Sequence, residues 1–202
     1  MNIKKLRRTI GEFTVVPVAS LSIRLLVRLQ GISRIRRSSG DLFDALRDSA
    51  HKNYEERAKA KYDIHPTVYW GEDTLIYGDG EIKIGEHSYC GKGSFLLAHP
   101  KGTKLKIGKY CAISHNVNIR TEINKKEPHY KHDLASPPAG KDVTIGDYVW
   151  IGANVFIGGG IVVGDNSIIG ANSVVTSDVP PNSIFAGVPA KQIGLKSDYE
   201  RT

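Results

Sequence analysis

The sequence predicts a mainly β protein: a parallel β-helix of about five 18-residue coils, preceded by an α-helical N-terminal segment. Three observations support this fold. A six-residue unit repeats toward the C-terminus, the same unit recurs upstream in sets of three, and the N-terminal segment carries helical spacing instead. Repeats of this kind are typical of stacked architectures, in which each unit buries its apolar face against its neighbours.

Residues 1–62 form the first predicted region, a basic and mostly helical arm and cap. Residues 1–40 hold nine Lys and Arg against one Glu, a net charge of +8, so the other 162 residues carry −1 of the chain's +7. Apolar residues within 21–37 recur at helical spacing, which predicts an amphipathic basic helix. This helix lies either on an anionic membrane surface or against the protein itself or a second subunit. Residues 41–61 predict a charged helix that caps the first coil, because a bare coil end would be an open sheet edge.

The most apolar stretch, residues 14–32, does not predict a membrane span. Pro17, Arg24 and Arg28 interrupt it, whereas a spanning helix needs about 20 apolar residues. The arginines also argue against a signal peptide, and no small-residue cleavage site follows cleanly. We expect a cytoplasmic protein, with contact to the inner face of the membrane through residues 1–40 as one role of the arm. Nucleic acid is not an expected partner, because no recognised binding motif accompanies the charge.

The coils of the second region, residues 63–180, follow from the repeat itself. From Ile145 the chain reads IGDYVW, IGANVF, IGGGIV, VGDNSI, IGANSV and VTSDVP, and every six begins with a β-branched aliphatic residue. The same spacing upstream gives five sets of three leading residues, at 64/70/76, 84/90/96, 107/113/119, 145/151/157 and 163/169/175. These leaders point inward and stack from coil to coil at about 4.8 Å. Glycine after a leader is expected to allow a tight turn, including a positive φ.

Extra residues are expected to gather along one edge of the β-helix. The coil starts are separated by 20, 23, 38 and 18 residues, and each surplus over 18 can be placed after the third leader. The largest surplus gives a loop over residues 120–144. A long loop without its own repeat is often functional.

This sequence resembles the hexapeptide-repeat acyltransferases, whose fold is a left-handed parallel β-helix. The resemblance covers residues 64–194 and is strongest over IGDYVWIGANVFIGGGIVVGDNSIIGANSVVTSDVPPNSIFAGVPAKQIG. That stretch looks like the acetyl-CoA-dependent O-acetyltransferases, which include the galactoside, maltose and exopolysaccharide enzymes. The resemblance implies acetyl transfer to a sugar hydroxyl of a glycan or glycan precursor. It also implies a homotrimer with sites between subunits, and a C-terminal extension, residues 181–202, near the CoA site.

Histidines supply the expected general base. Acetyl transfer from a thioester to a hydroxyl needs a base near neutral pH, and histidine is the usual one. In the resembling enzymes a loop histidine precedes a V-W-I-G strand, and here His129 precedes Trp150 by 21 residues. The resemblance therefore implies His129 as the base in a direct transfer. His132 and then His115, within ISHNVN, are the alternatives.

The resemblance also assigns contacts to acetyl-CoA, the acyl donor. The predicted residues are Trp150, Ala153, Ala171, Thr176 and Lys191. The amide of Ala153 would stabilise the thioester oxyanion, although plain coil packing accounts for each alanine nearly as well. Ser177 stands where the family often has lysine, so Lys191 in VPAK is assigned to the CoA phosphates. The family's acceptor-contacting asparagine has no counterpart in YCGKGSF, which indicates an acceptor other than the galactoside.

Two other functions compete with the acetyltransferase. One is a carbonic anhydrase-like zinc metalloprotein, for which His115, His129 and His132 lack the expected spacing; the acetyltransferase itself requires no metal. The other is a non-catalytic trimeric scaffold that presents the basic arm. The two cysteines, Cys90 and Cys111, form no CxxC motif and are interpreted as reduced packing residues.

Overall fold

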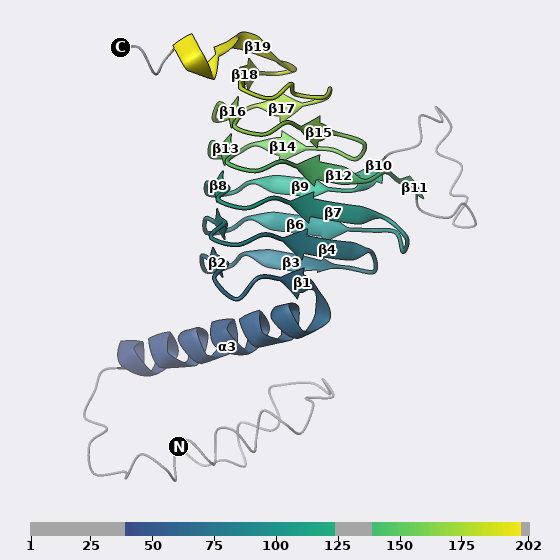
Figure 1. Cartoon of the computed structure of the whole chain (residues 1–202). Coiled ribbons are helices and arrows are strands. Elements are labelled where there is room, and N and C mark those ends of the chain that lie inside the picture. The colour runs from purple at the N-terminus through teal and green to yellow at the C-terminus, as the bar shows by residue number, and fades with distance from the viewer. Residues whose placement is uncertain (1–38, 124–138, 199–202) are drawn as a thin grey trace, which may run out of the picture. The chain divides into compact units, whose positions relative to one another are not determined.

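The computed structural model describes residues 39–123 and 139–198, most of which form a stack of short strands (Figure 1). The chain divides into two compact units, Met1–Asp48 and Ser49–Thr202. The helix α3 (Ser39–Lys61) crosses from the first unit into the second, and the described strands belong to the second. The predicted amphipathic helix within residues 21–37 lies outside the described residues. Among the helices that are described, none has the length and apolarity to cross a membrane.

The strands of the coils form three sheets, here called sheets A, B and C, and each coil contributes one strand to each. Sheet A contains β1 (Asp63–Ile64), β4 (Glu81–Ile84), β7 (Lys104–Ile107), β12 (Val143–Ile145) and β15 (Val162–Val163). Sheet B contains β2 (Tyr69–Trp70), β5 (Tyr89–Cys90), β8 (Ala112–Ile113), β13 (Trp150–Ile151) and β16 (Ile168–Ile169). Sheet C contains β3 (Leu75–Gly78), β6 (Phe95–Ala98), β9 (Asn118–Arg120), β14 (Phe156–Ile157) and β17 (Val174–Val175). A separate two-stranded sheet lies outside the coils, between β9 and β12 in the sequence. The predicted fold class, a parallel β-helix of about five coils after a helix, is confirmed.

The leading residues stack in the predicted register. On sheet A, for example, Ile84 pairs with Ile107 and Ile107 with Ile145. Every predicted leader is buried, from Ile64 to Val175. The core is therefore a narrow column of aliphatic side chains, and its burial favours the stacked form.

Different structural elements cover the two ends of the column. At the first coil, the Tyr54 hydroxyl on α3 accepts from the Ile76 amide at 2.6 Å and donates to the Ile76 carbonyl at 2.9 Å. Ala58 of the same helix is buried in the core, so the C-terminal half of α3 covers the edge that the first coil leaves open. At the last coil, β18 (Ser183–Gly187) extends sheet B and β19 (Ala190–Leu195) pairs with it antiparallel, before the short 3-10 helix η2 (Lys196–Asp198).

The turns correct one expectation about glycine. Positive φ occurs at the fourth residue of the six, as in Asn154 (φ 59°), and not at the glycine after the leader. That glycine is needed for clearance instead. A Cβ on Gly152 would lie 2.6 Å from the amide nitrogen of Ala171, because the next coil passes directly against it. Asparagine suits the fourth place because it tolerates the left-handed conformation.

Candidate active site

Sheet C has two unlike edges, which carry the candidate site residues. We call the turns from sheet B to sheet C the uniform edge; they cover residues 71–74, 91–94, 114–117, 152–155 and 170–173. The connections from sheet C to sheet A are the variable edge; they cover residues 79–80, 99–103, 121–142 and 158–161. The extra residues thus lie after the third leader, as predicted.

The uniform edge brings together two of the predicted CoA contacts. Ala153 and Ala171 lie one coil apart, and the Asn172 amide donates to the Ala153 carbonyl at 2.8 Å. Within the described part of the chain, the amides of both alanines have no hydrogen-bond acceptor. They are therefore available to a ligand that carries carbonyl oxygens.

The other three predicted CoA contacts do not all lie on the uniform edge. Lys191 pairs with Ala186, and Ala186 in turn lies over Gly170, so Lys191 continues the uniform edge beyond the last coil. Trp150 projects from β13 and is 53% exposed. Thr176 follows β17 on the opposite edge of sheet C, so the structure does not place it with the alanines.

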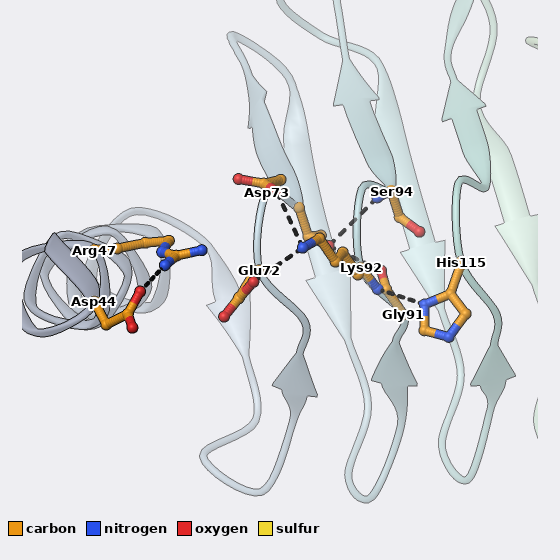
Figure 2. A network of polar contacts seen from close by, with 9 residues as sticks. Asp44, Arg47, Glu72, Asp73, Gly91, Lys92, Ser94 and His115 are labelled. Atoms are coloured by element: carbon orange, nitrogen blue, oxygen red, sulfur yellow. Dashed lines mark hydrogen bonds and ion pairs between the residues drawn. The ribbon is translucent and has the colours of Figure 1, made fainter. Parts of the chain in front are cut away.

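His115 occupies the uniform edge directly before Ala153 in the stack. Its Nδ1 accepts a hydrogen bond from the Lys92 amide at 3.0 Å (Figure 2). A neutral histidine that accepts at Nδ1 carries its proton on Nε2. In this arrangement His115 presents a hydrogen-bond donor to solvent and has no free ring lone pair for a base.

Lys92 shares that network with two carboxylates of the preceding coil. Its ammonium lies 3.0 Å from Glu72 and 3.7 Å from Asp73 (Figure 2). The hydrogen bond to Glu72 is the main reason that the pKa of Lys92 is raised above its ordinary value. Lys92 therefore forms ion pairs with these two carboxylates on the uniform edge.

The predicted catalytic loop leaves from the variable edge. His129 and His132 lie outside the described residues, but the foot of their loop is described. There β10 (Glu122–Ile123) pairs antiparallel with β11 (Ala139–Gly140), which brings the two ends of the loop together. Thr121 is fully buried beside β10, and its hydroxyl accepts a hydrogen bond from the His99 amide at 2.8 Å. This bond attaches the foot of the loop to the preceding coil.

Two hollows beside the foot were not predicted from the sequence. A pocket of about 510 Å³ is lined in part by Tyr77, Asp79 and His99, and a second, of about 280 Å³, by Phe156 and Gly158. His99 Nδ1 lies 3.4 Å from the Asp79 carboxylate. One signal was present: Asp79 and His99 are 20 residues apart, the spacing between the first two coils.

The cysteines are packing residues, as expected. Burial raises the pKa of Cys90 to about 12, and burial also raises the pKa of Cys111. Neither thiol is ionised near neutral pH, so neither is a ready nucleophile. Within the described residues, no three or more His, Cys, Asp and Glu side chains gather as a metal site would require.

Comparison with known proteins identifies the repeat. The family described as bacterial transferase hexapeptide (six repeats) matches residues 142–177. Residues 142–177 therefore carry the hexapeptide repeat of bacterial transferases. The chain is similar to a maltose O-acetyltransferase from Clostridium difficile 630, with 25% identity over 87% of this chain and 84% of that chain and a TM-score of 0.61. The predicted resemblance to the sugar O-acetyltransferases, and with it the acetyltransferase class, is confirmed by these matches.

Two further solved structures share the fold. The acetyltransferase VCA0836 of Vibrio cholerae O1 biovar eltor, complexed with acetyl coenzyme A, is 24% identical over 79% of this chain and 91% of that chain (TM-score 0.58). A galactoside acetyltransferase in complex with coenzyme A is 24% identical over 100% and 94% (TM-score 0.54).

Proposed function

We propose that the protein transfers an acetyl group from acetyl-CoA to a sugar hydroxyl of a glycan or glycan precursor. The observation that carries this proposal is the hexapeptide repeat at residues 142–177 within a chain that resembles a maltose O-acetyltransferase over 87% of its length. Neighbours of the same fold were solved with acetyl coenzyme A or coenzyme A.

The uniform edge supports a CoA site. The amides of Ala153 and Ala171 would meet the carbonyl oxygens of the thioester and of the extended pantetheine arm. Lys191 stands at the far end of the same row, where a cation would neutralise the CoA phosphates. The Ala153 amide would then face the oxyanion that develops on the thioester carbonyl. Trp150 lines the thioester end, and Thr176 belongs to this proposal only by the resemblance.

His129 serves as the general base. Its imidazole takes the proton of the acceptor hydroxyl as the oxygen forms a bond to the thioester carbonyl carbon. The carbon–sulfur bond breaks as the tetrahedral intermediate collapses, and the imidazolium returns the proton to the leaving thiolate. His132 is the alternative on the same loop. His115 is disfavoured, because its Nδ1 already accepts the Lys92 amide.

Assembly and location complete the proposal. The active form is a homotrimer, with each site between two subunits, in the cytoplasm. Residues 1–40 contact the inner face of the membrane through their net charge of +8. Sedimentation with anionic liposomes should require these residues, and equal pelleting of a chain that lacks them would refute the membrane contact.

The test is release of free CoA thiol from acetyl-CoA in the presence of candidate glycans. We expect release that depends on the acceptor and leaves an acetylated sugar detectable by mass spectrometry. Purified protein that holds stoichiometric zinc and releases no thiol would favour the zinc metalloprotein. Absence of both zinc and activity would favour the trimeric scaffold.

A further inference from the structure

The two hollows on the variable edge adjoin each other. Their volumes are about 510 and 280 Å³, and Arg120 and Glu122 line both. We call the combined depression the loop-foot groove. It extends from Tyr77 on the first coil to Phe156 on the fourth, three coil spacings or about 14 Å. Its length exceeds that of a single sugar ring.

The groove combines aromatic surface with paired hydrogen-bonding groups. Tyr77 and Phe156 stand toward its two ends and are 41% and 37% exposed. The carboxylates of Asp79 and Glu122 and the guanidinium of Arg120 also line the groove, with Asp79 next to Tyr77 on the first coil and Arg120 and Glu122 on the third. Aromatic faces cover the C–H face of a pyranose ring, while carboxylates accept from its hydroxyls and a guanidinium donates to them.

The polar side chains are already held in place. Arg120 Nε donates to Asn118 Oδ1 at 2.8 Å, and its guanidinium lies 5.8 Å from the centre of the Phe156 ring and 3.9 Å from the Glu122 carboxylate. Tyr77 packs edge-to-face against Phe95. Side chains that are fixed in advance lose little conformational entropy when a ligand binds.

The charge of the groove argues for a neutral ligand. Lys61 and Arg120 balance Asp79 and Glu122, and the Lys61 ammonium is also bound to the Gly78 carbonyl at 2.8 Å. The CoA phosphates would need an excess of cations, which this groove does not offer. CoA and the occupant of the groove therefore belong to different parts of the surface.

We propose that the loop-foot groove binds several sugar residues of a neutral glycan. It would hold the acceptor through sugar residues other than the one that carries the reacting hydroxyl. The identity of that glycan as the acceptor rests on the proposed function, whereas its binding in the groove does not. The position supports this role, because Glu122 of β10 both lines the groove and begins the loop that carries His129.

Binding to an array of neutral and uronate-containing saccharides, from monosaccharides to hexasaccharides, tests the proposal. Wild-type protein should bind neutral oligosaccharides more tightly than monosaccharides. Arg120→Met and Tyr77→Ala should each raise Kd by about tenfold or more, since each removes a main contact. Tyr69→Ala is the matched control: Tyr69 is a tyrosine of the same coil, 65% exposed on sheet B, and its loss should leave Kd unchanged.

The proposal is overturned if the array shows no binding of neutral oligosaccharides, if uronate-containing saccharides are preferred, or if the groove variants bind as tightly as the control. Glu122→Gln, which changes only one half-buried carboxylate to an amide, decides between these outcomes if the other variants fail to fold. Thiol release is measured separately. Groove-dependent binding without thiol release would support the groove and refute acetyl transfer, whereas thiol release with oligosaccharides that is insensitive to the groove variants would refute the groove alone.

Discussion

The two edges of sheet C differ although the same strands lead into both. On the uniform edge the turns keep one length, and the side chains of Asn116, Asn154 and Asn172 form a hydrogen-bonded ladder at 3.2 and 3.0 Å. On the variable edge the connections range from a short turn to a long loop, and the groove lies beside them. Stacking constrains an edge only where each coil must lie against the next. Where the chain leaves the stack, length and composition are free to serve a function.

The sharpest way to break this comparison is to remove the proposed base, His129, from the loop of the variable edge. We expect His129→Ala to lower kcat by about a thousandfold, as loss of a general base typically does, which corresponds to about 4 kcal/mol of barrier. CoA binding, assigned to the uniform edge, should stay the same. Single-turnover acetyl transfer and CoA titration measure the two quantities. His65→Ala, an exposed histidine on neither edge, is the control, and full activity in His129→Ala would exclude it as the base.

Glycine at the second place of the six-residue unit allows the space for a Cβ to be compared at the two edges. Gly152 and Gly158 each follow a leader. A Cβ on Gly152 would meet backbone at 2.6 Å, while on Gly158 it would meet only the Phe156 ring at 3.5 Å. We expect Gly152→Ala to lower the free energy of unfolding by about 1–3 kcal/mol, because the next coil must shift. Gly158→Ala should be neutral or slightly stabilising. Urea unfolding measures both, and equal losses would show that the edges are packed alike.

The stack of coils could be predicted from the sequence, but only part of the candidate site could. The leaders were predictable because each must point inward and meet its equivalent one coil away, so Ile107 between Ile84 and Ile145 is fixed by the repeat. The role of the glycines was predicted wrongly. A glycine required for clearance and one required for positive φ look the same in a sequence, and only the spacing between coils distinguishes them.

The variable edge could not be deduced in this way. Asp79 and His99 are 20 residues apart, as the first two coils are, but the connections that carry them differ in length, so this spacing alone does not predict that the two side chains meet. Likewise, Thr176 was grouped with the alanines by resemblance, although a full strand of sheet C separates them in the structure. His129 remains a prediction from its position in the loop.

The smallest expected effect concerns the asparagine ladder, which separates backbone conformation from side-chain hydrogen bonding on the uniform edge. Asn154 has a φ of 59° and bonds to both neighbours in the ladder. Asn154→Ala removes the bonds and leaves a β-carbon in the left-handed region, so the free energy of unfolding should fall by about 1–2 kcal/mol. Asn154→Gly removes the same bonds without that strain and should cost less than about 1 kcal/mol, since exposed hydrogen bonds contribute little net stability. Urea midpoints at constant m-value distinguish the two variants. If glycine costs as much as alanine, the ladder and not the turn conformation makes this edge uniform.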